Sequence, residues 1–360
     1  MKKIPQLDAV RGLAVLLVLL HNTNIYRSLH LRFISDNGWM GVDLFFVLSG
    51  FLITGILLDA KQSESYFKNF YARRCLRIWP LYYSALLFMF VIVPLLRPSE
   101  ARVIFDTRSS PWWSYLFFAQ NFLVPIPSSA TGLLGVTWSL AVEEQFYLVW
   151  PLVVRFCNEI QLRGIAIAVI CFSPALRFYL SLHHVNIYSN TFCRLDGLMA
   201  GALLALTVRS ANFMPLNFVK RAWIVLLVSA PLALVIESHH ARWIGFSAIA
   251  MASVSFVYLA LFSTNRGLRA ILTNRFLVYT GTISYGTYLL QKIPLDVVKA
   301  FHLDKHAFLA FVFATTTTYV MASVSWILLE QPFLRLKRFF EGKRSYQNPI
   351  PDELVGAAQG

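Results

Sequence analysis

Long apolar runs separated by short polar or basic segments make up most of this chain. Several runs approach the roughly 20 residues that a transmembrane helix needs. The longest lie at residues 42–58, 81–96, 165–182, 223–236, 244–262 and 308–329. The pattern predicts an all-α, polytopic integral membrane protein with no soluble part of any size.

About ten spans fit this pattern. They are expected at 10–27, 40–58, 79–96, 136–154, 164–182, 194–208, 222–237, 243–263, 277–298 and 307–329. Residues 1–340 then form one transmembrane domain. The polar tail 341–360 is predicted to be disordered.

Composition supports a membrane protein, because 57% of the residues are hydrophobic and only 14% are charged. The net charge of +14 does not indicate nucleic acid, since its distribution follows the predicted topology. With the N-terminus inside, 20 of the 32 lysines and arginines fall in inner segments, eight in outer segments and four within spans. This positive-inside asymmetry predicts that both termini are cytoplasmic. The protein is expected in the inner membrane.

The ends and connections of the spans add four expectations. Asp8 and Arg11 interrupt a start that imitates a signal peptide, so the first span is expected to be retained. The outer connection 97–135 holds an aromatic segment expected at the membrane interface. Pro80 is expected to start the third span. The four cysteines lack zinc-like spacing, and no metal site is expected.

Ionisable residues inside spans are costly, by roughly 2.5–3.5 kcal/mol each, and therefore tend to face protein or water. They are Arg11, His21, Asp43, Glu143, Glu144, Arg194, Asp196 and Glu330. Ten positions separate Arg11 from His21, which places their side chains about 80° and about 15 Å apart on a helix. His21 is either a base in a cavity or an inert, hydrogen-bonded histidine at the outer interface.

The remaining charges also allow two interpretations each. Adjacent Glu143 and Glu144 point about 100° apart, so they serve either one cavity and one buried arginine, or only helix packing. Arg74 and Arg77 share one helical face as a phosphate-binding fork or as inner-leaflet anchors.

Arg194 and Asp196 open the sixth span. They are interpreted as a local ion pair, and Gly197 and Gly201 after them as sites of close helix packing.

Seven segments in order resemble the acyltransferase family 3 membrane proteins, which include polysaccharide O-acetyltransferases and acylases of macrolides and Nod factors. The resemblance covers about residues 5–337. Its segments are "LDAVRGLAVLLVLLH", "GVDLFFVLSGFLIT", "FYARRCLRIWPLYY", "TWSLAVEEQFYLVWPL", "RLDGLMAG", "ISYGTYLLQKIPL" and "LEQPFLRL".

The resemblance implies transfer of an acyl group, usually acetyl, from acyl-CoA to a hydroxyl of a cell-surface or secreted carbohydrate. No permanently bound cofactor is implied, since acetyl-CoA is a co-substrate. His21 and Glu143 are the implied catalytic residues, and Arg11, Arg74 and Arg77 would bind the donor. Substrate contacts are assigned to Asp43, Glu144, Arg194 and Asp196.

Two departures from the family pattern bear on the site. The histidine of the first span usually stands eleven positions after the arginine, where this chain has Asn22, and His21 comes one step early. A second family histidine is Gln291 here. Two rival functions therefore stay open: a transporter or flippase of a polysaccharide or lipid-linked substrate, and a non-catalytic partner in membrane assembly. The sequence does not fix the oligomeric state.

Overall fold

The computed structural model describes residues 4–23, 36–96, 111–123, 132–210, 213–238, 242–300 and 307–340. Every regular element in these ranges is a helix, which confirms the all-α prediction. The long helices are α1 (Pro5–Asn22), α4 (Gly41–Ala60), α5 (Tyr66–Leu87), α10 (Thr137–Phe156), α11 (Glu159–Leu182), α12 (Leu195–Val208), α13 (Pro215–Ser238), α14 (Arg242–Phe262) and α19 (Ala307–Ser325). The predicted tail 341–360 lies outside the described residues.

Short elements connect or extend these helices. They are η1 (Gly38–Met40), η2 (Phe88–Ile92), α6 (Val93–Leu96), α8 (Trp112–Leu116), α9 (Gln120–Leu123), η3 (Gly132–Val136), η4 (Thr191–Cys193), α15 (Arg266–Leu272), α16 (Arg275–Thr282), α17 (Ser284–Leu290), α18 (Lys292–Ala300), η6 (Trp326–Glu330), α20 (Gln331–Arg335) and η7 (Leu336–Phe340).

The protein is polytopic, as predicted. Six segments in the described ranges are long and apolar enough to cross a membrane: Gly38–Ala60, Tyr66–Leu95, Glu159–Leu182, Pro215–Val235, Trp243–Phe262 and Phe308–Phe340. Helices α1 and α10 have similar lengths, but ionisable residues interrupt their apolar stretches. With 14 residues, α12 is shorter than a usual span.

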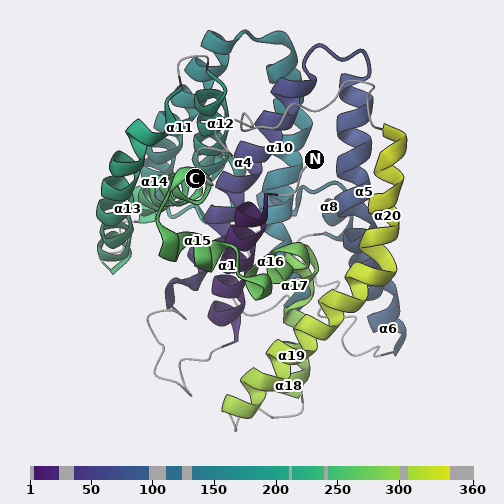
Figure 1. Ribbon diagram of the computed structural model, residues 1–360. Coiled ribbons are helices and arrows are strands. Elements are labelled where there is room, and N and C mark those ends of the chain that lie inside the picture. The colour runs from purple at the N-terminus through teal and green to yellow at the C-terminus, as the bar shows by residue number, and fades with distance from the viewer. Residues whose placement is uncertain are drawn as a thin grey trace.

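Helix α1 lies inside the bundle and packs against α4, α14, α16 and α17. Figure 1 shows α4 and α10 side by side near the centre, α13 with α14 at one edge, and α5 with α20 at the opposite edge. Helices from both ends of the sequence therefore surround α1, and a side chain on α1 reaches several of them.

Glycines allow two of these helix pairs to touch through their backbones. A Cβ on Gly281 of α16 would lie 1.7 Å from the carbonyl oxygen of Asp8 in α1. Between α4 and α12, a Cβ on Gly201 would lie 2.1 Å from the carbonyl oxygen of Val47, which confirms the packing role predicted for Gly201. A Cβ on Gly197 would meet only the Phe46 Cβ, at an ordinary 3.4 Å, so the same prediction is wrong for Gly197.

Two predicted spans differ from the structure. Helix α5 begins at Tyr66 and continues through Pro80, so the prediction of a helix start at Pro80 is wrong. The basic segment before Pro80 is helical, and Pro80 removes only one hydrogen bond within that helix.

The predicted span 277–298 is divided into α16, α17 and α18. Pro294 cannot donate to the carbonyl of Leu290, the last residue of α17, which favours the break there.

The aromatic segment 111–123, which holds α8 and α9, folds back onto the bundle. The Tyr82 hydroxyl on α5 donates a 2.8 Å hydrogen bond to the Tyr115 carbonyl in α8. The Gln145 amide on α10 donates to the Asn121 side chain in α9, at 2.9 Å. These bonds place α8 and α9 across α5 and α10, the two helices that carry much of the site below.

We expect Gly201→Ala to lower the melting temperature of the detergent-solubilised protein. The added methyl group overlaps a backbone oxygen that cannot move independently, which destabilises the fold by about 1–3 kcal/mol. Gly197→Ala is the matched control on the same helix and should melt like the wild type. Equal melting temperatures for the two variants would contradict this account of the α4–α12 contact.

Candidate active site

Side chains from α1, α4, α5, α10 and α17 surround a cavity of about 100 Å³. Its wall combines guanidiniums, one carboxylate and several hydroxyls with apolar side chains. The polar lining residues are Arg11, Ser49, Arg74, Arg77, Ser139, Glu143, Tyr147, Ser284, Tyr285 and Tyr288. The structure thus brings together four of the predicted site residues, Arg11, Arg74, Arg77 and Glu143.

The arginines of the cavity differ in whether a carboxylate forms an ion pair with them. Arg11 forms an ion pair with Asp8, one turn away on α1, at 2.8 Å. Arg74 and Arg77 are half-buried on one face of α5 and form no hydrogen bond or ion pair with the residues that the structure describes. The Arg74 guanidinium lies 5.6 Å from the centroid of the Tyr147 ring, a cation–π contact. The cavity therefore carries an excess of positive charge that suits an anion.

Glu143 is the carboxylate of the cavity. The Ser49 hydroxyl on α4 donates to its Oε1 at 2.7 Å, and the Tyr147 hydroxyl, one turn further along α10, donates to its Oε2 at 3.3 Å. Two hydroxyl donors fix the carboxylate without neutralising it. Among the described residues, no cation lies within ion-pair distance of Glu143.

Glu144 faces away from the cavity, as the predicted divergence of the two carboxylates requires. It does not line the wall. Its Oε1 is buried without a hydrogen-bond partner among the described residues.

Hydroxyl groups that the sequence analysis did not single out complete the wall. Ser139 Oγ and the Tyr288 hydroxyl lie 2.7 Å apart, and the Tyr288 hydroxyl also donates to the Val136 carbonyl at 3.1 Å. Tyr285 lies one turn earlier on α17. Spacing by three on one helical face, within "ISYGTYLLQKIPL", was the available signal for these two tyrosines.

His21 does not line this cavity. It lies in the last turn of α1, ten residues from Arg11, and its Cβ would be 3.0 Å from a Cβ on Gly38. The half-buried side chain of His21 is therefore attached where α1 contacts η1.

The two departures from the family pattern contact each other. The Asn22 amide donates to Gln291 Oε1 at 3.3 Å, and Gln291 is fully buried. Lys292 donates to Asn22 Oδ1 at 2.6 Å, and Gln291 Nε2 donates to the Tyr288 carbonyl at 2.9 Å. The place of the two family histidines is therefore occupied by a hydrogen-bonded amide pair with an ammonium group beside it.

Asp43, Arg194 and Asp196 are also absent from the cavity wall, because their charges are compensated elsewhere. Arg194 pairs with Asp43 of α4 at 2.8 Å, while Asp196 pairs with Arg177 of α11, also at 2.8 Å. The predicted local pair between Arg194 and Asp196 is therefore wrong.

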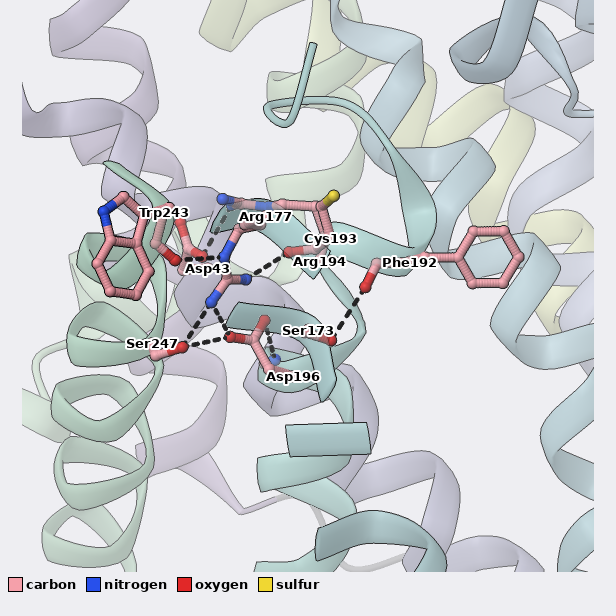
Figure 2. Close-up of polar contacts among 10 residues, drawn as sticks. Asp43, Ser173, Arg177, Phe192, Cys193, Arg194, Asp196, Trp243 and Ser247 are labelled. Atoms are coloured by element: carbon pink, nitrogen blue, oxygen red, sulfur yellow. Dashed lines mark hydrogen bonds and ion pairs between the residues drawn. The ribbon is translucent and has the colours of Figure 1, made fainter. Parts of the chain in front are cut away.

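Figure 2 shows how Arg177 joins three helices. Its Nη2 donates to Asp196 and to the Ser247 hydroxyl on α14, while its Nε donates to the Trp243 carbonyl at 2.7 Å. Arg177 was not among the predicted site residues, although it is an isolated charge in a long apolar run.

Aromatic rings enclose the Arg194 guanidinium. The nearest is Phe246, with its ring centroid 3.9 Å away, and Phe46, Trp138 and Tyr188 surround it further out. The ring of Phe46 also lines the cavity, so the buried ion pairs support one side of its wall.

We expect Asp43→Asn to lower the free energy of unfolding by about 3–5 kcal/mol, because it leaves Arg194 charged and buried without its partner. Thermal unfolding in detergent measures the effect. Glu159→Gln removes an exposed ion pair with Arg163 and should change stability by no more than about 0.5 kcal/mol. An Asp43→Asn variant as stable as this control would show that the buried pair does not stabilise the fold.

Comparison with known proteins gives a consistent family. The acyltransferase domain family model matches residues 4–329. A provisionally named O-acetyltransferase of Staphylococcus aureus (strain COL), SACOL0978, is 26% identical over 92% of this chain and 58% of its own length. The peptidoglycan O-acetyltransferase OatA of Listeria monocytogenes is 34% identical over 42% of this chain and 24% of its own. No solved structure matches the chain.

This chain spans little more than half the length of the staphylococcal relatives that it matches along most of its sequence. The activity of a whole relative therefore does not pass directly to this chain. The match gives the family of the helical domain, and the cavity described above lies within that domain.

Proposed function

Since this chain belongs to the family of acyltransferase domains, we propose that it is an integral membrane O-acyltransferase. It would move an acyl group, acetyl in the first place, from acyl-CoA to a hydroxyl of a cell-surface or secreted carbohydrate. The observation that supports this most is the cavity in which uncompensated guanidiniums, a hydrogen-bonded carboxylate and several hydroxyls meet. The relatives' names, which include peptidoglycan O-acetyltransferases, make a glycan polymer the first acceptor to assay.

Arg74 and Arg77 would bind phosphates of the donor. A guanidinium presents a planar fork of donors that fits phosphate oxygens, and these two form no ion pair within the described part of the chain. With both termini cytoplasmic, the N-terminal part of α5 faces the cytoplasm, where acyl-CoA is available. The inner membrane is the matching location, and acyl-CoA acts as a co-substrate rather than a bound cofactor.

Glu143 would act as the general base. The acceptor oxygen attacks the thioester carbonyl while its proton passes to the Glu143 carboxylate. Collapse of the tetrahedral intermediate then breaks the carbon–sulfur bond, and the departing thiolate takes up that proton. Ser49 and Tyr147 hold the carboxylate in place for this exchange.

The developing oxyanion needs hydrogen-bond donors on the same wall. The paired hydroxyls of Ser139 and Tyr288 face the cavity and lie on two different helices, α10 and α17. A bound substrate can take one of these hydrogens from its present acceptor. This role is the one that preorganised donors play in acyl transfer.

His21 is the alternative base, and it would have to act from the end of α1, about 15 Å from Arg11. A non-catalytic function is the second candidate, and the amide pair of Asn22 and Gln291 is the observation that favours it. Amides do not accept protons near neutral pH, so no base stands at those two positions. Transfer of labelled acetyl groups by the purified protein distinguishes the enzyme from this candidate and from a transporter.

If Glu143 is the base, Glu143→Gln should reduce the rate of acetyl transfer by at least 100-fold, because the amide keeps the shape of the side chain but accepts no proton. Transfer of labelled acetyl from acetyl-CoA to isolated cell-wall glycan measures this. Glu144→Gln is the adjacent control and should retain most of the activity. A large loss with His21→Ala and near-normal turnover with Glu143→Gln would assign the base to His21 instead.

If Arg74 and Arg77 bind phosphate, replacing either with Gln should weaken CoA binding by roughly 10-fold or more, as loss of a charge-assisted hydrogen bond does. Isothermal titration of the detergent-solubilised protein gives the dissociation constants. Arg266→Gln removes an exposed arginine outside the cavity and should leave binding unchanged. Unchanged CoA affinity in both cavity variants would remove the donor site from these arginines.

A further inference from the structure

A lysine from the end of the described chain extends the positive charge of the cavity. Lys337 lies on η7, which packs against α5. Figure 1 shows the preceding helix α20 running beside α5. Within the segment 331–340, formed by α20 and η7, the Lys337 side chain is half-buried, whereas Arg335 and Arg338 are exposed. The segment therefore directs one of these three cations toward the bundle.

Lys337 is surrounded mainly by like charges. The charged groups that act on it most strongly are four guanidiniums, those of Arg77, Arg74, Arg73 and Arg11. Neither Lys337 nor Arg73 forms a hydrogen bond or ion pair with the described residues. Asp8 pairs with Arg11, and carboxylates lie near Arg74 and Arg77, but the described residues place no carboxylate within ion-pair distance of Arg73 or Lys337. Like charges close together are unfavourable unless an anion compensates them, and a donor with several phosphates can reach both groups of cations.

The five cations fall into two groups by position. Arg11, Arg74 and Arg77 line the cavity next to Glu143, whereas Arg73 and Lys337 lie outside its wall. In an acyl-CoA the order of groups is thioester, pantetheine arm, diphosphate, and ribose with a 3′-phosphate monoester. If the thioester lies at Glu143, the monoester is the phosphate that extends furthest from the cavity.

We propose that Lys337 and Arg73 form a second phosphate subsite, which binds the phosphate monoester of the donor while the cavity arginines bind its diphosphate. This proposal rests on the proposed function, because it takes acyl-CoA as the donor. Its chemistry is recognition of a phosphate monoester. An anionic lipid headgroup is another source of phosphate near the membrane surface, and the experiment below separates the two sources.

The test compares CoA with 3′-dephospho-CoA on the purified full chain in uncharged detergent, by isothermal titration. We expect the wild type to bind CoA about 10-fold more tightly than 3′-dephospho-CoA. Lys337→Gln should lose most of that preference, with the affinity for 3′-dephospho-CoA within about twofold of the wild type. Lys337→Arg should keep the preference, and Arg335→Gln is the matched control from the exposed face of the same segment.

Four outcomes would overturn the subsite in different ways. Equal binding of both nucleotides by the wild type, or equal weakening of both by Lys337→Gln, would show that Lys337 does not contact the monoester. Loss of co-purifying phosphatidylglycerol with unchanged CoA affinity would assign Lys337 to lipid. Absence of any CoA binding by the folded wild type would instead remove the proposed donor, and the subsite with it.

Discussion

Compensation of buried charge is the constraint on which this structure depends. A charged group at membrane depth is tolerated when protein groups neutralise it or when water or a ligand reaches it. Asp43 with Arg194, and Asp196 with Arg177, satisfy the first condition and join α4, α11, α12 and α14. Arg74 and Arg77 form no ion pair with any described residue, so they meet the first condition only in part. The same residue type therefore holds helices together in one part of the bundle and leaves positive charge for a ligand in another.

The arrangement of helices around α1 connects these two parts. Phe46 contacts the Arg194 guanidinium and lines the cavity, so the paired charges position one side of the proposed catalytic chamber. Glycines that bring α1 against α16 and α12 against α4 leave little freedom for these helices to shift. Helix α5 also lines the cavity, and its Arg74 and Arg77 form no ion pair with the described residues. Helix packing thus fixes one part of the cavity wall, while the part on α5 carries positive charge that a ligand can neutralise.

Much of the fold follows from hydropathy, because a run of apolar residues near 20 in length has few alternatives to a membrane helix. The errors come where hydropathy carries no information. The basic residues before Pro80 do not look like part of a membrane helix, so the first turns of α5 were not predicted. The run 277–298 is apolar throughout, so the breaks on either side of α17 were not predicted. Helix breaks depend on proline and on contacts such as that between Gly281 and Asp8, which the local pattern does not reveal.

For the site, residues on one face of a helix could be grouped from spacing, and Arg74 with Arg77 and the divergence of Glu143 from Glu144 are examples. Pairs between helices could not be predicted from spacing, since partners such as Arg194 and Asp43 lie 151 positions apart. Asn22 and Gln291 illustrate the consequence, because they lie 269 positions apart and share one hydrogen bond. Gln291 Nε2 keeps its bond to the Tyr288 carbonyl without Asn22, but replacing Asn22 with a side chain that cannot donate would leave Gln291 Oε1 buried without this partner. These two positions are therefore coupled, and a replacement at position 22 suits this interior only when its side chain still donates a hydrogen bond to Gln291.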